Sequence, residues 1–280
     1  MKDKQRPIGK NKDNEKKNLL LVSKGFFHPS LLVRWNFRML LQTLHKDYQI
    51  TYTSKLDDLS LLKYDISENT ADSNDRNIDM DTDINTNSDK PYYDGIILLF
   101  HEKVLSPHLL EIIRKYLARG GGLMAVHGAM ASFKAMPEYA HILGSKFTGH
   151  GTPGKIKVSK ALKTTEVPGP SESSESSKPS RATKISKPSK TSIPNKSYSS
   201  NDSFTIKDEL YLYDFDNTNR VLWWGESGEE TAAIVWTRTE GAGRVFCFSL
   251  GHYASTFKSV HIKGIITEGL SWITGGEEPW

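Results

Sequence analysis

The sequence contains a single cysteine, Cys247, and no apolar run long enough to cross a membrane. One thiol excludes an internal disulfide and a cysteine-based zinc site. A transmembrane helix needs about 18 or more consecutive apolar residues, which no segment approaches, and the N-terminal residues lack a hydrophobic signal core. These absences predict a cytoplasmic protein without a membrane partner. The basic run KNKDNEKK at 10–17 leaves a nuclear location open.

Large apolar side chains are also scarce, and the shortage is local. Hydrophobic residues make up 37% of the chain, but few of them fall within three stretches rich in polar residues. Such stretches bury too little surface to offset the entropy lost on ordering. We therefore expect a disordered tail at 1–17 and disordered insertions at 65–90 and 160–203. The remainder predicts one domain over 18–276.

Positive charge is scarce in the part that is predicted to fold. The formal net charge of the whole chain is +4. The three polar stretches carry net charges of +4, −6 and +4, which leaves only +2 for the rest. A nearly neutral folded part offers no basic face for nucleic acid, so no specific nucleic-acid partner is expected.

The apolar pattern of the first half alternates between strands and helices. Buried strands are typically short, wholly apolar runs, and helices show an apolar stripe. Two successive strand–helix–strand units predict an α/β fold, a three-layer sandwich with a mostly parallel sheet between helices. The expected strands are 18–23, 48–53, 93–100 and 123–126, and the expected helices are 29–46 and 107–119.

The second half is richer in extended segments. The turn EGAG at 240–243 predicts a hairpin, and the amphipathic segment 257–273 predicts a closing helix. The expected strands are 155–158, 209–213, 221–224, 233–238 and 244–249.

Histidines follow several of the expected strands. His28, His101, His127 and His252 come at or shortly after strand ends, and His150 lies in the glycine-flanked loop TGHG. Ligands of open parallel sheets bind beyond the carboxyl ends of the strands, so these imidazoles could share a site. Loop histidines are more often structural hydrogen-bonding residues. Imidazole also suits a divalent metal, although the sequence has no HExxH pattern.

Other candidate motifs are weaker. Gly120–Gly122 precedes a strand and therefore does not form a phosphate loop. Ser249 and His252 have the spacing S-x-x-H, a pair that also arises by chance. Trp224 and Trp236 fit a hydrophobic core, with stacking on a sugar as the alternative.

Several motifs together resemble the trehalose-utilisation (ThuA-like) family, a branch of the class I glutamine-amidotransferase-like fold, which is flavodoxin-like. The resemblance implies a single ThuA-like domain and a role in carbohydrate metabolism. The matching segments are GFFH at 25–28, YDGIILL at 93–99, YLARGGGLMAVHGA at 116–129, Phe133 with EYAHILGSKFTGH at 138–150, DELY at 208–211 and IVWTRTEGAGRVFCFSLGH at 234–252.

This resemblance also implies that glutaminase chemistry is absent. Amidotransferases of this fold place a cysteine nucleophile at the turn after one strand, and His127 stands near that place here. His252 matches their histidine, but Ala254 stands where their glutamate would be. Cys247 lies within an expected strand and cannot substitute, and an imidazole cannot form the thioester.

The remaining residues match the family's own site. The resemblance implies that His127 and His252 are catalytic and that His28, His150 and Glu209 bind the substrate, a sugar or keto-sugar. The chemistry would be acid–base catalysis by histidine, with a divalent metal as a candidate cofactor. The alternative is a catalytically inactive binding module that uses its insertions to dock partners. Homo-oligomerisation stays open.

Overall fold

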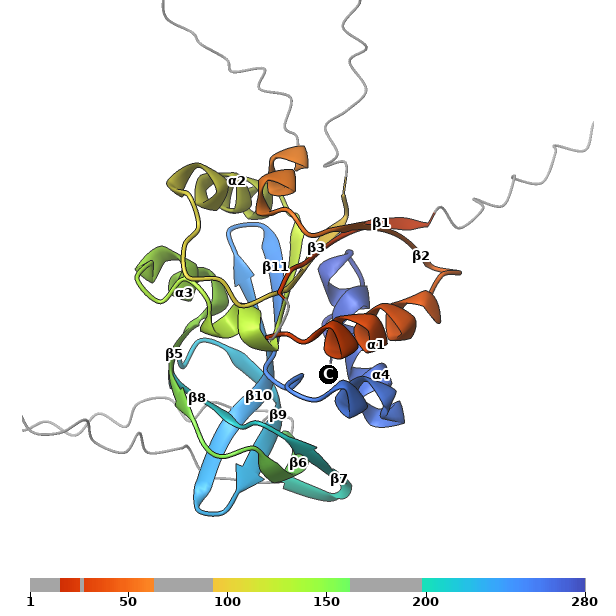
Figure 1. Ribbon diagram of the computed structural model, residues 1–280, viewed down its shortest axis with the longest axis vertical. Helices are drawn as coiled ribbons and strands as arrows, with labels where there is room; N and C mark the ends of the chain where they lie inside the picture. The colour runs from red at the N-terminus through yellow and green to blue at the C-terminus, as the bar shows by residue number, and fades with distance from the viewer. Residues whose placement is uncertain (1–15, 26–27, 63–92, 162–197, 280) are drawn as a thin grey trace, which may run out of the picture.

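The computed structural model describes residues 16–25, 28–62, 93–161 and 198–279 (Figure 1). Its main sheet has nine strands in the order β2-β1-β3-β4-β11-β10-β9-β6-β7, and β5 pairs separately with β8. The strands are β1 (Lys17–Ser23), β2 (Tyr48–Thr53), β3 (Gly95–Leu99), β4 (Gly122–Val126), β5 (Ser145–His150), β6 (Gly154–Ala161), β7 (Tyr198–Asp208), β8 (Tyr211–Phe215), β9 (Arg220–Ser227), β10 (Glu230–Glu240) and β11 (Gly243–Phe248).

The main sheet is parallel in one half and antiparallel in the other. β1 pairs in parallel with β2 and β3, and β4 pairs in parallel with β3 and β11. From β11 onward, β10, β9, β6 and β7 are joined by antiparallel pairing. The predicted hairpin at 240–243 connects β10 to β11 and begins this change of direction. The parallel core that the first half of the sequence predicts is therefore confirmed.

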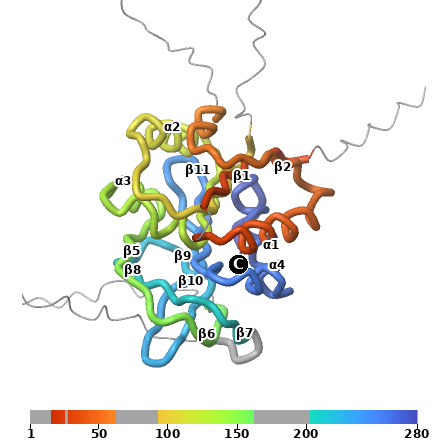
Figure 2. Tube along the Cα trace, in the orientation of Figure 1, coloured from red at the N-terminus to blue at the C-terminus, as the bar shows by residue number. Residues whose placement is uncertain are grey.

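Helices cover both faces of the parallel core, as Figures 1 and 2 show. Leu19 and Leu21 of β1 belong to the core cluster that includes α1 and α4. Leu20 and Val22 belong to the opposite cluster, which includes α2 and α3. Both faces of β1 are buried along its central run LLLV at 19–22, which explains why that run is wholly apolar. The helices are α1 (Leu31–Gln42), α2 (Pro107–Ala118), α3 (Pro137–Leu143) and α4 (Val260–Ile273).

Serine side chains define where the first two helices begin. Ser30 Oγ accepts a hydrogen bond from Val33 N at 3.3 Å, so α1 starts two residues later than predicted. Ser106 caps α2 in the same way. Among the described helices, none has the length and hydropathy needed to cross a membrane.

The predicted second insertion is too wide at both ends. β6 continues to Ala161 and β7 begins at Tyr198, and these two residues are paired in the ladder. β7 is an edge strand, and edge strands tolerate the polar residues that suggested disorder. Residues 162–197 and the predicted insertion 65–90 lie outside the described residues. The predicted tail at 1–17 is also one residue too long, because β1 begins at Lys17.

Candidate functional site

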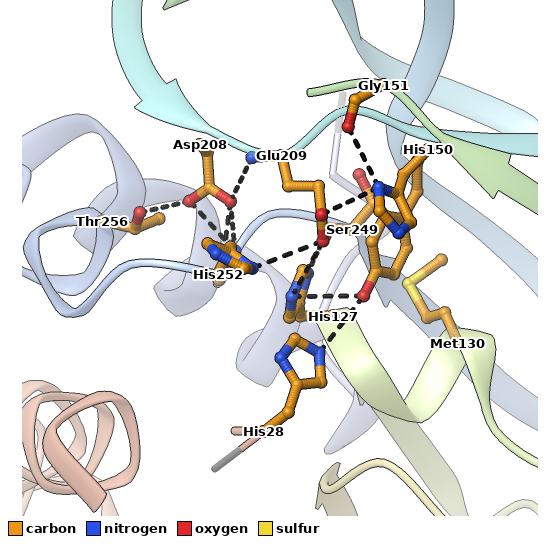
Figure 3. A network of polar contacts seen from close by, with 12 residues as sticks. His28, His127, Met130, His150, Gly151, Asp208, Glu209, Ser249, His252 and Thr256 are labelled. Atoms are coloured by element: carbon orange, nitrogen blue, oxygen red, sulfur yellow. Dashed lines mark hydrogen bonds and ion pairs between the residues drawn. The ribbon is translucent and has the colours of Figure 1, made fainter. Parts of the chain in front are cut away.

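Two adjacent parallel strands, β4 and β11, place histidines at one edge of the sheet (Figure 3). His127 follows β4 directly and has a left-handed backbone with φ 45°. His252 lies four residues beyond the end of β11, after Gly251. The two imidazole ring centroids are 5.9 Å apart. A Cβ added at Gly251, where φ is 141°, would lie 3.0 Å from His127 Cβ, so this glycine makes room for the imidazole.

His127 is fully buried, and its hydrogen bonds define its tautomer. Nδ1 lies 2.8 Å from the carbonyl oxygen of Ser249, which can only accept, so Nδ1 carries the proton. Nε2 lies 3.2 Å from the hydroxyl of Tyr211 and accepts from it in the neutral ring. Burial holds the pKa of His127 well below its ordinary value, and His28 and His252 lower it further. The imidazole is therefore neutral, with a lone pair on Nε2.

Glu209 lies among three imidazoles, in the connection between β7 and β8 (Figure 3). Its Oε1 is 2.9 Å from His150 Nδ1. Its Oε2 is 3.4 Å from His252 Nδ1 and 3.9 Å from His127 Nε2. The carboxylate side chain is only 6% exposed, so its contacts with these rings are largely shielded from water.

His28 completes the cluster from the loop after β1. Its ring centroid lies 5.0 Å from that of His127 and 5.7 Å from that of His252. Burial lowers the pKa of His28 to about 4, with further contributions from His101, His252 and His150. The ring of His101 is 5.3 Å from that of His28, but His101 is exposed at the margin of the cluster. One ring nitrogen from each of His28, His127 and His252 lies within 4.8 Å of the others, a spacing that could hold a metal ion.

Tyr211 is a site residue that the sequence did not identify. Its hydroxyl lies 3.2 Å from His127 Nε2 and 3.5 Å from His28 Nε2. Burial raises the pKa of Tyr211, and the charges of Glu209 and Asp208 raise it further, so the phenol stays protonated. The motif DELY at 208–211 contains Tyr211, but only Glu209 of that motif was assigned a role from the sequence.

Asp208 was also missed, and it fastens the loop that carries His252. Its buried carboxylate accepts hydrogen bonds from the backbone N–H of Glu209 at 2.8 Å and of His252 at 3.0 Å. Gly251 N and the hydroxyl of Thr256 donate to it as well. Burial raises the pKa of Asp208, and these donors offset part of that effect. The motif DELY thus contributes three residues to the site. Asp208 anchors the loop of His252, Glu209 places a carboxylate among the imidazoles, and Tyr211 contributes a phenol.

Several other residues that the sequence offered as candidates are buried or pack against the core. Ser249 is fully buried, and its backbone carbonyl oxygen accepts a hydrogen bond from His127 Nδ1. Trp236 is a core residue whose indole N–H donates to Leu143 O at 2.9 Å, which excludes stacking on a sugar. Trp224 packs against the core cluster on the α2 and α3 face. Cys247 is fully buried, and burial raises the pKa of its thiol.

A cavity of about 450 Å³ lies beside the histidine cluster and is lined by residues between Met130 and Phe147. None of the predicted site residues lines it. The ring of Phe147 contacts that of Tyr211, with centroids 4.8 Å apart, and so separates the cavity from the imidazoles. Lys134 places its Nζ 4.4 Å from the centre of the Phe147 ring. The titratable side chains that line the cavity include Lys134 and His141, and the predicted site histidines belong to the neighbouring cluster.

Comparison with known proteins gives matches in sequence and in fold. A family model described as ThuA, trehalose utilisation, matches residues 63–273. A ThuA-like protein from Bacteroides uniformis is 14% identical, covering 96% of this chain and 95% of that chain with a TM-score of 0.59. One from Parabacteroides merdae is 15% identical, covering 95% and 92% with a TM-score of 0.60. No match is found among curated proteins. At these identities the likeness to the solved structures shows a shared fold.

Proposed function

This chain belongs to the ThuA, or trehalose-utilisation, family, and we propose that it binds a sugar or keto-sugar at the histidine cluster and transforms it by proton transfer. The family description indicates a carbohydrate-related function. The observation that carries the finer proposal is the carboxylate of Glu209, which lies 2.9 Å from His150 Nδ1 and 3.4 Å from His252 Nδ1. A carboxylate that orients an imidazole and stabilises its charged form is a common arrangement in acid–base catalysis.

His252 is the proposed proton carrier on the exposed side of the cluster. Its side chain is 29% exposed, so a ligand can reach the ring, while Glu209 supports it from the buried side. In a keto-sugar, the hydrogen on the carbon beside the carbonyl is the most acidic C–H. Removal of this proton by His252 gives an enediolate. Its return to the same carbon completes an exchange; its return to the former carbonyl carbon, with transfer of the hydroxyl proton from one oxygen to the other, completes an isomerisation.

His127 is the second proposed catalytic residue, and it acts through Tyr211. Because His127 is fully buried, its Nε2 reaches a ligand by way of the Tyr211 hydroxyl, which lies 3.2 Å away. The phenol keeps its proton and can donate a hydrogen bond to the developing oxyanion. In this proposal His28 and His150 hold the sugar hydroxyls, and Glu209, whose side chain is only 6% exposed, orients His150 and His252. His28 and His150 are both open to solvent in part, as hydroxyl binding requires.

Wash-in of deuterium tests this function without any added cofactor. The full-length protein is incubated in D2O with trehalose, other disaccharides and their 3-keto derivatives, and proton NMR follows loss of the signal beside the carbonyl. We expect exchange of a keto-sugar by the wild type. The isosteric Glu209→Gln variant should lower the rate by about 10²–10⁴-fold, the usual contribution of acid–base catalysis. His108→Ala, an exposed change on α2, is the matched control and should leave the rate unchanged.

The same experiment discriminates the alternative function. Saturable sugar binding with no exchange for any keto-sugar would favour a catalytically inactive binding module. Exchange that survives Glu209→Gln would contradict the proposed role of the carboxylate. We also expect no ammonia release from glutamine, because the one thiol of the chain, Cys247, is buried within β11.

A further inference from the structure

We propose that His28, His127 and His252 bind one divalent transition-metal ion, with Zn²⁺ as the best fit to their chemistry. The inference rests on the proposed function in that it assigns a cofactor to the same site. Each residue offers one ring nitrogen, and the three nitrogens lie within 4.8 Å of one another. They come from three separate segments, the loops after β1, β4 and β11, which meet at one edge of the sheet (Figure 3).

The spacing of the nitrogens is close to that of a metal site. Zn–N bonds of about 2.1 Å in tetrahedral geometry place two nitrogens about 3.4 Å apart. The observed limit of 4.8 Å therefore requires each ring to move inward by less than about 1 Å, a shift that small side-chain rotations provide. His28 and His252 are only partly buried and can rotate, while His127 is buried and forms the rigid member.

The hydrogen bonds of His127 prepare it as a ligand. Metal-binding histidines usually donate their other ring N–H to a carbonyl or carboxylate, which orients the ring and increases its basicity. His127 donates from Nδ1 to the carbonyl oxygen of Ser249 at 2.8 Å, so Nε2 carries a lone pair. This lone pair accepts from the Tyr211 hydroxyl at 3.2 Å, and a bound ion would take the place of that hydrogen bond. The acceptor of the Nδ1 proton is a backbone carbonyl one residue beyond β11, so that bond depends on no second side chain.

Glu209 supports the ion through His252. The Nδ1 atom of His252 is buried without a well-aligned hydrogen-bond partner, although Glu209 Oε2 lies 3.4 Å from it. If Nε2 of His252 binds the ion, Nδ1–H donates to this carboxylate. If Nδ1 binds, Oε2 is close enough to become a fourth ligand, since it is also 3.9 Å from His127 Nε2. In both arrangements removal of the carboxylate charge weakens metal binding.

The donor set favours a transition metal over Mg²⁺ or Ca²⁺. Imidazole nitrogen suits Zn²⁺, Cu²⁺, Ni²⁺ and Fe²⁺, whereas Mg²⁺ and Ca²⁺ require mostly oxygen ligands. In the arrangement with three histidine ligands, a fourth position is left for a substrate oxygen, where the ion would polarise the carbonyl of a keto-sugar. With His127 and His252 as ligands, the proton-carrier role proposed for His252 would fall to His150, whose Nδ1 lies 2.9 Å from Glu209 Oε1.

Metal binding is measured on the full-length protein in the absence of sugar. The protein is treated with EDTA, dialysed and titrated with Co²⁺, whose visible absorption reports the coordination geometry, and then with Zn²⁺ in competition. We expect one equivalent to bind. His28→Ala and His252→Ala should each lower the affinity by more than about 100-fold, and Glu209→Gln should lower it by about 10–100-fold, as for other outer-shell partners. Both histidines are partly exposed, so these variants should stay folded, which circular dichroism checks.

His101→Ala is the matched control. This imidazole lies 5.3 Å from the ring of His28 but does not belong to the three-nitrogen set, so the variant should bind metal like the wild type. Absence of stoichiometric binding would overturn the inference. So would binding that survives both His28→Ala and His252→Ala, because the ion would then lie on other histidines.

The two proposals fail separately. If the EDTA-treated protein exchanges the keto-sugar proton at the full rate and binds no metal, the metal site is refuted and the proposed function stands. If the protein binds one equivalent through these histidines but exchanges no keto-sugar, the metal site stands and the proposed reaction is refuted.

Discussion

Replacement of Asp208 with alanine should destabilise the protein by about 3–5 kcal/mol, since each buried donor left unpaired costs about 1–3 kcal/mol. Three backbone N–H groups lose their acceptor, those of Glu209, Gly251 and His252. The Thr256 hydroxyl also loses its partner, but it can rotate. The site is fully buried, so water does not easily replace the carboxylate. The costs of the three unpaired N–H groups are not additive, so the expected loss lies near the lower end of their sum.

Asp208→Asn separates the hydrogen bonds from the charge. The amide oxygen can take the place of Oδ1, which accepts from Glu209 N at 2.8 Å and from His252 N at 3.0 Å. Neutralisation weakens these bonds but removes the cost of burying a charge, the same cost that raises the pKa of Asp208. We therefore expect the asparagine variant to lose less than half of the stability that the alanine variant loses.

Urea unfolding at neutral pH, followed by tryptophan fluorescence, measures both changes. A loss of about 3–5 kcal/mol corresponds to a fall in Tm of roughly 10 °C for a folded region of this size. Asp214→Ala, an exposed change on β8, is the control and should stay within about 0.5 kcal/mol of the wild type. An alanine variant that loses less than about 1 kcal/mol, the net contribution of a single typical hydrogen bond, would refute the reasoning. So would an asparagine variant whose free energy of unfolding falls as much as that of the alanine variant.

Three further predictions concern stability and the site. Burial raises the pKa of Tyr139, so this phenol ionises in the unfolded chain before it ionises in the folded protein. The free energy of unfolding should therefore fall above pH 10, by up to about 1.4 kcal/mol per pH unit for this group. Tyr139→Phe should flatten that slope, which urea titrations at pH 8–11 measure. Replacement of 162–197 by a Gly/Ser turn of about four residues between β6 and β7 should raise the Tm by only a few degrees, because about three halvings of the connection gain about 0.6 kcal/mol each; a collapse of folding would contradict this. Gly251→Ala should displace His127, since the added Cβ would lie 3.0 Å from His127 Cβ at φ 141°, and should lower both stability and Co²⁺ affinity relative to the neighbouring change Tyr253→Phe.

Local sequence was sufficient for the elements whose signal is strong over a few residues. The wholly apolar run in β1 predicts a strand buried on both faces, and Ser106 before Pro107 predicts the start of α2. β7 was missed because its Ser- and Asn-rich sequence resembles a disordered segment, and its strand conformation depends on pairing with β6. An edge strand of this polar composition has little local signal of its own, although β7 is 11 residues long.

The candidate site shows the same division. His127 and His252 were predicted to meet because parallel strands end at one edge, and their rings are 5.9 Å apart. Asp208 and Tyr211 were missed because their partners lie far along the chain. The Asp208 carboxylate binds a loop 44 residues away, and the Tyr211 hydroxyl lies 3.2 Å from a histidine 84 residues away.

The sequence by itself determined the class of fold, the alternation of strands and helices and the imidazoles at the strand ends, because each depends on short-range patterns of polarity. Only the tertiary structure decided how those imidazoles are used. It places Glu209 between His150 and His252, and it buries His127 against Ser249. The physical reason is that a site is defined by distances of a few ångströms between segments distant in sequence, and these distances depend on how the whole sheet packs.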